Sequence, residues 1–274
     1  MKFWKLTSSK AQPLPPLNLF SNTAGILKPI MGKADLHIHT TYSMDGTANV
    51  RETLEAAVRA GLDVIAITDH DEVRGALDAR AISNEYGIHV IPGIEVSTNE
   101  GHLVVLFVDR NIPTDMSLID TLICVREMGG TAIVAHPDQP SPTSISMQSI
   151  LKALEHPEAR EVLHGIEIYN MNPTHSPFNG RSQNAAEKLP LAKIASSDAH
   201  IASMIGAGVT GFEGSTSREL RQAIQRRSTQ PQQINYERPM RIFFRWLRLF
   251  IGRKLSEVFT RQATARPAPS QSID

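Results

Sequence analysis

The segment from Lys33 to Gly46, KADLHIHTTYSMDG, concentrates side chains that can bind a metal ion. Asp35, His37 and His39 alternate with apolar residues, and Asp45 follows six residues after the second histidine. Alternate residues of a β-strand share one face, so a strand here would present the first three polar side chains together. Because imidazole and carboxylate groups are common ligands of divalent ions, this spacing predicts one wall of a metal site.

Further histidines and acids stand at the ends of other short apolar runs. Five runs end in or near such a residue, and the run HLVVLFV begins with one, His102. In an α/β barrel the functional groups collect at the carboxyl ends of the strands, so we expect these side chains to converge. Beyond the first segment, the candidate ligands are His70, Glu95, His102, His136, Asp198 and His200.

Together with His37, His39 and Asp45 these make nine candidate ligands, more than one tetrahedral ion can use. We therefore expect two or three divalent ions, with Glu95 bridging two of them through its two oxygens. Asp35 is expected to orient a histidine and not to bind metal. The alternative is a set of polar groups without any ligand, which is costly wherever such groups are buried.

Amphipathic segments separate several of these runs and predict helices. The predicted helices cover residues 49–61, 71–87, 114–130 and 216–227. Asn49 with Glu52, and Thr216 with Glu219, have the spacing of a capping box. Strands that alternate with helices favour an α/β fold with parallel strands, either a TIM-like barrel of about seven strands or an open doubly wound sheet.

Composition excludes some classes of protein. The 274 residues are enough for one large domain with extensions, and the 28 basic residues equal the 28 acidic ones. The balance gives no whole-chain electrostatic argument for binding nucleic acid or membranes. Cys124 is the only cysteine, so an internal disulfide is impossible. Without a secretory signal or an apolar run of roughly 20 residues, a cytoplasmic location is expected.

Seven motifs in order resemble the PHP family (polymerase and histidinol phosphatase) of metal-dependent phosphoesterases. The motifs are DLHIHTTYSMDG, AITDHD, IPGIEVS, GHLVVL, AIVAHP, IYN and IASSDAH, and they lie between Ala34 and Thr210. The resemblance implies a distorted seven-stranded β/α barrel that holds two or three divalent ions. It also implies three domains: an N-terminal extension at 1–33, a PHP-type metallophosphoesterase domain at 34–230 and a C-terminal tail at 231–274.

The resemblance assigns the ligands to three ions. The first ion would be bound by His37, His39, Glu95 and Asp198, the second by Glu95, His102 and His136, and the third by Asp45, His70 and His200. Some family members have histidine at the position of Asp45. A carboxylate there is a harder ligand than imidazole, so we expect the third site to prefer Mn or Fe to Zn.

The catalytic residues implied are His37, His39, Asp45, His70, Glu95, His136, Asp198 and His200. A hydroxide held between two ions would attack the phosphorus in line. The candidate substrate-binding residues are Asn170, His175 and Arg181, and the fork of Arg181 suits phosphate. The group that assists the leaving oxygen stays open among His200, Asp45 and His175. The direction of Glu167, in GIEIYN, also stays open.

The predicted function is hydrolysis of a phosphate ester of a small molecule, either nucleotide-like or another phosphorylated metabolite. One alternative is an exonuclease or phosphodiesterase that acts on nucleic-acid ends, since the same metal chemistry serves both. Another is a non-catalytic metal-binding scaffold module. An amidohydrolase is disfavoured because none of these strand ends carries the lysine that usually bridges the metal pair in such enzymes.

The C-terminal tail, residues 231–274, is basic and rich in aromatic residues. Its segment MRIFFRWLRLFIGRKLSEVF predicts an amphipathic helix, and the following TRQATARPAPSQSID predicts disorder. A basic amphipathic helix can lie on an anionic membrane surface, dock in a partner or pack on its own barrel. Packing on the barrel or forming a dimer is the favoured interpretation.

Overall fold

The computed structural model describes residues 30–234 and 237–264. At its centre lies a mixed sheet of nine strands in the order β7-β6-β5-β4-β3-β2-β1-β8-β9. The strands are β1 (Met31–Asp35), β2 (Val64–Ile67), β3 (His89–Thr98), β4 (Gly101–Leu106), β5 (Thr131–Val134), β6 (Leu163–Asn170), β7 (Ala192–Ser196), β8 (Gly208–Glu213) and β9 (Gln230–Gln233).

Strand direction divides the sheet into parallel and antiparallel parts. The series β1–β3 and β5–β7 are parallel, whereas β4 is antiparallel to both of its neighbours and β8 is antiparallel to β1 and β9. A two-residue turn joins β3 to β4, too short for the crossover that a parallel pair requires. The strands are therefore nine in place of the expected seven, and only part of the sheet is parallel.

Hydrogen bonds bring the two halves of the sheet together into a nearly closed barrel. The Thr210 hydroxyl of β8 donates to the Ala195 carbonyl of β7 at 2.9 Å and accepts from the Ala195 N–H at 3.0 Å. Past the end of β1, Ile38 pairs with Ala199. The predicted barrel-like α/β fold is thus confirmed, and the open doubly wound alternative is wrong.

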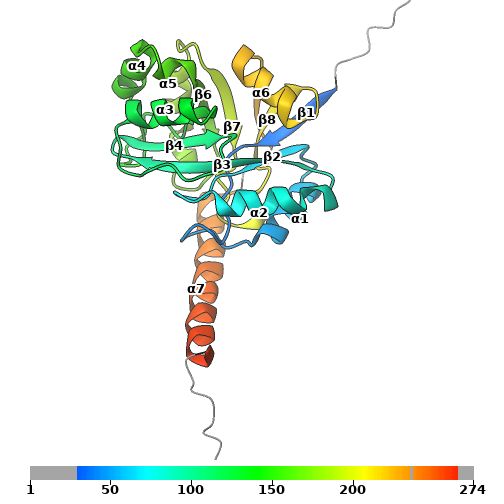
Figure 1. Cartoon of the computed structure of the whole chain (residues 1–274). Helices are drawn as coiled ribbons and strands as arrows, with labels where there is room; N and C mark the ends of the chain where they lie inside the picture. Colours follow the sequence, from blue (N-terminus) through cyan, green and yellow to red (C-terminus); the bar gives the residue numbers. More distant parts are fainter. Residues whose placement is uncertain (1–29, 235–236, 265–274) are drawn as a thin grey trace, which may run out of the picture.

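Seven α-helices surround the sheet: α1 (Val50–Arg59), α2 (Arg74–Ile82), α3 (Leu118–Glu127), α4 (Met147–Glu155), α5 (Asn179–Ala186), α6 (Ser217–Arg226) and α7 (Pro239–Thr264). Figure 1 shows α3, α4 and α5 grouped beside one part of the sheet and α1 and α2 beside another. Both predicted capping boxes are present, at Asn49 with Glu52 and at Thr216 with Glu219. The sequence had not indicated α4 or α5.

Side chains from most of the strands form a buried apolar cluster in the barrel. The cluster includes Val64, Ile91, Val104, Ile133, Ile194 and Phe212, together with Leu220, Ala223 and Ile224 of α6. Two further clusters lie under the other helices. This packing holds the strand ends, and with them the polar side chains that follow, at fixed positions.

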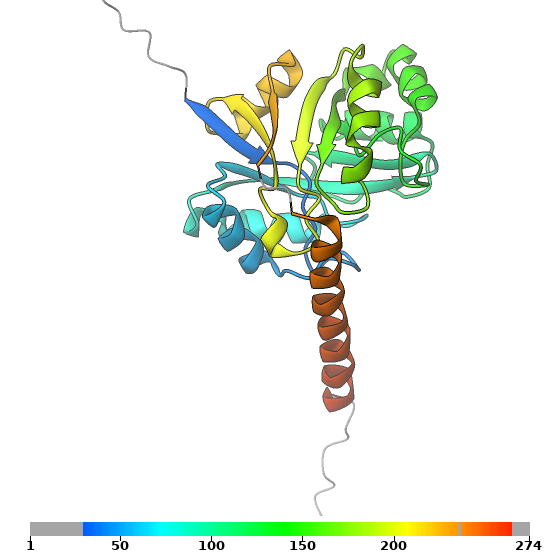
Figure 2. The same ribbon diagram turned by 180° about the vertical axis from the view of Figure 1, so that it is seen from behind.

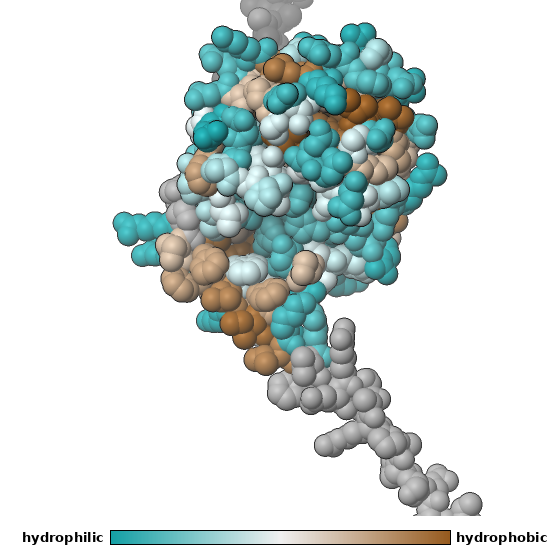
Figure 3. Space-filling view, turned by 90° about the vertical axis from the view of Figure 1, so that its left-hand side faces the viewer, coloured by the Kyte–Doolittle hydropathy of each residue, from teal (hydrophilic) through white to brown (hydrophobic). Residues whose placement is uncertain are grey.

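The C-terminal helix α7 begins on the barrel and then extends away from it, as Figures 1 and 2 both show. Its first turns pack on the protein itself, since Ile242 is buried and Trp246 joins the same apolar cluster. Other apolar side chains of this helix are exposed, and Figure 3 shows the hydrophobic surface along it. These exposed residues are Met240, Phe243, Phe244, Leu249, Ile251 and Leu255.

The expected domain boundaries at residues 33 and 230 each fall inside or at the edge of a strand. Residues 31–33 belong to β1 and pair with β8, and residues 230–233 form β9. Most of the expected N-terminal extension, residues 1–29, and residues 265–274 of the tail lie outside the described residues. No helix in the described ranges has the length and apolar character needed to span a membrane.

Replacing Phe212 by alanine tests the packing of the barrel interior. Phe212 is fully buried, so Phe212→Ala should lower the free energy of unfolding by about 3–5 kcal/mol, through lost apolar burial and the cavity left behind. Urea denaturation measures this. Leu151→Ala on α4, where the side chain is 46% exposed, is the matched control and should change it by less than about 1 kcal/mol. Equal effects of the two substitutions would contradict the assignment of Phe212 to the core.

Candidate metal centre

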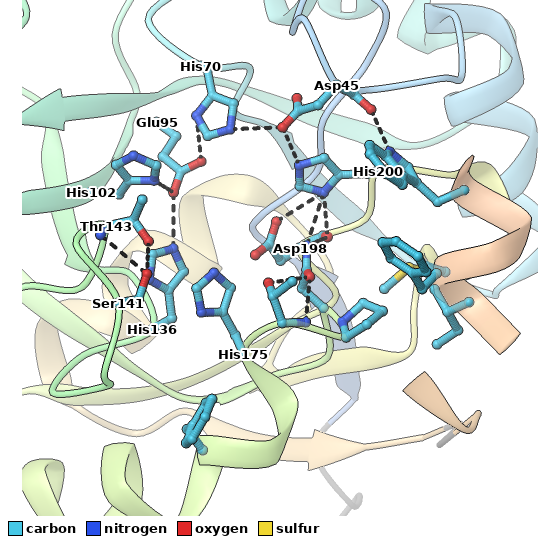
Figure 4. A pocket seen from close by; sticks show the side chains of 18 of the residues that line it. Asp45, His70, Glu95, His102, His136, Ser141, Thr143, His175, Asp198 and His200 are labelled. Carbon is cyan, nitrogen blue, oxygen red and sulfur yellow. Dashed lines mark hydrogen bonds and ion pairs between the residues drawn. The ribbon is translucent and has the colours of Figure 1, made fainter. Parts of the chain in front are cut away.

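All nine predicted ligands meet around one end of the barrel. Figure 4 shows Asp45, His70, Glu95, His102, His136, Asp198 and His200 facing the same cavity. Donor atoms within 4.8 Å of one another form four groups that could hold an ion. The groups are His37 with His39 and Glu95; His70 with Glu95 and His102; His39 with Asp45, His70 and His200; and His136 with His175 and Asp198.

The buried carboxylate of Glu95 lies at the middle of this arrangement. Its Oε1 is 2.9 Å from His102 Nδ1 and 3.3 Å from His136 Nε2. Around Oε2 lie three more ring nitrogens, at 3.1, 3.3 and 3.1 Å, from His37, His39 and His70. The two oxygens thus face different sets of histidines, as a carboxylate that bridges two ions must.

His102 reaches this centre because β4 is antiparallel. Its run begins with the histidine, whereas His37, His39, His70, His136, Asp198 and His200 come after the ends of their strands. Reversing the strand brings its first residues to the same edge, and Ser97 of β3 pairs directly with His102. His102, which differs from the other ligands in lying at the start of its strand, is therefore part of the same site.

Two aspartates complete the acidic part of the site. Asp198 Oδ1 lies 3.2 Å from His39 Nε2 and 3.4 Å from His200 Nδ1. Asp45 Oδ2 lies 3.1 Å from His200 Nε2 and 3.5 Å from His70 Nε2. His200 therefore lies between the two aspartates and contacts both.

The donor atoms fit bound divalent ions. His37 Nε2, His39 Nε2 and Asp198 Oδ1 are buried and have no hydrogen-bond partner among the described residues. Such buried polar atoms are costly unless something satisfies them. Two donors each about 2.0–2.1 Å from a tetrahedral ion lie ~3.3 Å apart, which matches the separations seen here. Imidazole with carboxylate suits Zn, Fe or Mn.

Hydrogen bonds hold the ligand rings in orientation from behind. His37 Nδ1 lies 3.0 Å from Glu167 Oε1, and His39 Nδ1 lies 3.1 Å from Ser43 Oγ. Since each ring uses Nδ1 in this way, its Nε2 is directed at the centre. Partners of this kind fix the ring and tune a metal ligand. Ser43 in turn bonds to the buried carboxylate of Asp69 at 2.9 Å.

The fully buried Glu167 faces the site and not the apolar core. Besides His37, it accepts the backbone N–H of His136 at 2.9 Å and the amide of Asn170 at 3.0 Å. Asn170 also donates to Asp198 Oδ2 at 3.0 Å. Asn170 thus holds two carboxylates in place, and none of these contacts supports its predicted role in substrate binding. The acid within GIEIYN was the only sequence signal for Glu167.

Asp35 lies behind the site and supports its backbone. Its carboxylate accepts the N–H groups of Ser197 at 3.0 Å and Gly206 at 2.8 Å, and does not contact an imidazole ring. β1 ends at Asp35, so the period-two alternation that would place it with the histidines stops there. The expectation that it orients a histidine ring has no support in these contacts.

Charges inside the site shift the pKa values of its histidines. Burial alone would lower the pKa of His37, but the carboxylates of Asp198 and Glu95 outweigh burial and hold it well above the ordinary value. At His70 burial also lowers the pKa, but the carboxylates of Glu95 and Asp45 outweigh burial and raise this pKa to about 9. For Glu95, burial is outweighed by His37 and other histidines, so its pKa lies well below the ordinary value.

Two of the ligands lie on strained backbone. His136 has φ 28° and Asp198 has φ 47°, in the left-handed region that non-glycine residues seldom adopt. Such conformations cost of order 1–3 kcal/mol each and persist where surrounding contacts impose them. Both residues lie two positions past the end of a strand, where the turn of the backbone aims their side chains into the site.

A cavity of about 570 Å³ opens in front of the ligands. Ser141, Thr143 and Asn172 supply polar groups to its lining, while α7 contributes Ile242, Phe243 and Trp246. No lysine or arginine belongs to the lining in the described part of the chain. The α7 residues were predicted to form an apolar face, but nothing in the sequence placed them at this site.

Arg181 does not line the cavity. Its side chain is 60% exposed, and its Nε donates to the carbonyl of Asp138 at 2.9 Å. The geometry therefore offers no support for Arg181 as a phosphate clamp.

His175 does line the cavity, stacked on His136 with ring centroids 3.9 Å apart. Ser182 donates to a backbone carbonyl and accepts from Gln139 Nε2, which directs Gln139 Oε1 towards His175 Nδ1 at 2.9 Å. His175 thus carries its proton on Nδ1. Burial and the nearby His136 lower its pKa to about 4, so the ring is neutral at pH 7 and its Nε2 is an acceptor.

Residues 35–254 match the PHP domain. The chain belongs to the PHP domain family. The predicted resemblance is confirmed, and the chain is an enzyme of this family of metal-dependent phosphoesterases.

Relatives of known sequence and structure agree with this assignment. The uncharacterized protein MJ1587 of Methanocaldococcus jannaschii is 36% identical over 148 residues, which cover 50% of this chain and 81% of that protein. A 5'-3' exoribonuclease of Haemophilus influenzae is 38% identical over 99 residues, covering 35% of this chain and 36% of the enzyme. This chain therefore spans about a third of that exoribonuclease.

Among solved structures, the fold resembles a two-domain protein from Bacteroides vulgatus that contains a predicted PHP-like metal-dependent phosphoesterase. The TM-score is 0.62 at 23% sequence identity, with 79% of this chain and 70% of that chain covered. At this identity the likeness shows the fold.

Metal binding should depend on pH because bound ions displace protons from the histidines. Below its pKa of about 9, His70 carries a proton that the ion must replace, so affinity should rise with pH and level off above about 9. Calorimetric titration of the metal-free protein with Mn²⁺ at several pH values, in two buffers of different ionisation enthalpy, measures this. Equal heats in both buffers and a constant affinity from pH 6 to 9 would contradict it.

Proposed function

We propose that the protein hydrolyses a phosphate ester of a small molecule with a planar ring, as in a nucleotide. The lining of the cavity carries this proposal. The lining combines the histidines and carboxylates with three aromatic side chains, Phe178 before α5 and Phe243 and Trp246 of α7. Aromatic faces of this kind stack on planar groups. Because the lining has no lysine or arginine in the described residues, the charge of the phosphate would fall to the bound ions.

The proposed ions occupy the three ligand sets suggested by the family. His37, His39, Glu95 and Asp198 would hold one, Glu95, His102 and His136 a second, and Asp45, His70 and His200 a third. When bound, such ions polarise phosphoryl oxygens and lower the pKa of a water to about 7, which provides a nucleophile at neutral pH. The distances and orphaned donor atoms described above support this assignment, and the order of preference stays Mn or Fe before Zn.

Residues of the chain itself would orient the substrate. The hydroxyls of Ser141 and Thr143 and the amide of Asn172 lie in the cavity lining and are neutral hydrogen-bond donors for phosphate oxygens. His175 presents an acceptor at Nε2, so it suits a substrate hydroxyl or an ion better than a phosphate oxygen.

Action on nucleic-acid ends is the second candidate function. The identity of 38% to part of an exoribonuclease favours it. Against it, a strand of nucleic acid needs basic contacts along its backbone, and the cavity lining offers none in the described residues. A metal-quantified preparation assayed on nucleoside monophosphates, phosphodiesters and 5′-phosphorylated oligoribonucleotides separates the two. Faster turnover of the oligonucleotides would favour the nuclease, and bound metal without turnover of any substrate would favour a scaffold.

Replacing a central ligand should remove metal and activity together. In His37→Ala the site loses a donor that faces both Glu95 and Asp198, so phosphoesterase activity should fall by at least about 10³-fold and the metal content by at least one ion per chain. His89→Ala, which changes an exposed histidine at the start of β3, is the control and should leave both unchanged. Wild-type metal content and wild-type turnover in His37→Ala would contradict the proposal.

Substitution of the aromatic wall should change substrate preference. Phe243→Ala removes a ring from the cavity lining, and loss of stacking worth about 1–3 kcal/mol should lower kcat/KM for nucleotides by roughly 5- to 150-fold. The kcat/KM for glycerol phosphate should change little. Phe244→Ala, on the same helix but outside the cavity lining, is the matched control. Equal losses on both substrates would argue against recognition of a planar ring.

A further inference from the structure

Helix α7 is tied to the loop that carries Asp45. The indole Nε1 of Trp246 donates to the backbone carbonyl of Asp45 at 2.9 Å. Two turns farther along, the guanidinium of Arg253 donates to three carbonyls of the same loop. These acceptors are Thr41 at 3.0 Å, Ser43 at 3.1 Å and Gly46. One side chain of the last helix thus holds both ends of a loop more than 200 residues earlier.

This loop supplies two functional groups to the metal centre. Asp45 Oδ2 faces His70 and His200, and Ser43 Oγ lies 3.1 Å from His39 Nδ1. The Thr41 N–H donates to the Ala48 carbonyl, and Asp45 lies in the loop between these two residues. Its position therefore depends on the loop and not on a strand. Its partners His70 and His200, in contrast, directly follow β-structure of the barrel.

The chemistry of the contacts suits a clamp. Arg253 is largely buried, with 18% of its side chain exposed, and Glu257 binds its Nε at 2.7 Å. A guanidinium presents five donors in a rigid plane, so it can hold several carbonyls at once, which an ammonium cannot do with the same geometry. The loop itself is tight, since a Cβ at Gly46 would lie 2.0 Å from the Thr40 carbonyl oxygen. Small movements of this backbone would therefore displace Asp45.

We propose that Arg253 and Trp246 are positioning residues for the third ion, so that the set Asp45, His70 and His200 is complete only with α7 docked. The inference rests on the proposed function in one respect, namely that this set binds an ion. It adds that the C-terminal helix controls the occupancy of that ion. Loss of the clamp should weaken the third site and leave the two sites around Glu95 intact, because none of their ligands lies on the loop and Ser43, which bonds to His39, is also held by Asp69.

Mn²⁺ binding to the full-length, metal-free protein tests this without any substrate. Free Mn²⁺ followed by electron paramagnetic resonance gives the number of bound ions per chain and their affinities. In Arg253→Ala the weakest-held ion should lose affinity by about 10- to 100-fold, the usual effect of removing a group that supports a ligand, while the remaining ions bind as in wild type. Arg248→Ala, an exposed arginine on the same helix, is the matched control and should bind like wild type.

A second variant separates positioning from general packing. Trp246→Phe keeps an aromatic ring against the cavity but removes the Nε1 donor to Asp45, so it should weaken the same ion with an unchanged melting temperature of the metal-free protein. Wild-type stoichiometry and affinities in both Arg253→Ala and Trp246→Phe would overturn the inference and leave the proposed function standing. A wild-type protein that binds no Mn²⁺ at all would instead overturn the proposed function, and this inference with it.

Discussion

The structure depends above all on one buried carboxylate, Glu95, surrounded by nitrogen atoms of five histidines. A carboxylate taken out of water is costly unless positive charge or a metal ion compensates for it. Here the compensating groups come from four separate segments of the barrel. Closing the sheet, reversing β4 and turning the backbone sharply at His136 are all means of bringing those segments to one point. The same packing that closes the barrel therefore also assembles the site.

Buried hydrogen bonds behind the ligands make the arrangement rigid. Glu167 joins His37, His136 and Asn170, while Asp69 holds the loop from Thr40 to Ser43 through both backbone and hydroxyl groups. Networks that are fully satisfied in a low dielectric fix a single geometry, because any displacement leaves a polar atom unpaired. Among the buried atoms without a hydrogen-bond partner in the described residues, His37 Nε2, His39 Nε2 and Asp198 Oδ1 face the centre. Preorganisation of this kind favours ion binding over collapse of the site.

The cavity combines two unlike surfaces from different parts of the chain. The barrel supplies acids and histidines that the PHP family shares, and α7 supplies aromatic side chains and the contacts that hold the Asp45 loop. Under the proposed function, the barrel would supply the chemistry and α7 the contacts that select the substrate.

The sequence by itself identified all nine residues that gather at the centre and the capping boxes of α1 and α6. Such features are local, since a residue's donor atoms and its hydrogen bonds three positions away do not depend on distant packing. Only the tertiary structure decided how His102 reaches the site from the start of its strand, that Glu167 faces the site, that Arg181 points elsewhere and that α7 lines the cavity. Strand direction, the face that a side chain presents and the docking of a terminal helix are set by contacts between residues far apart in the chain, which spacing along it does not record.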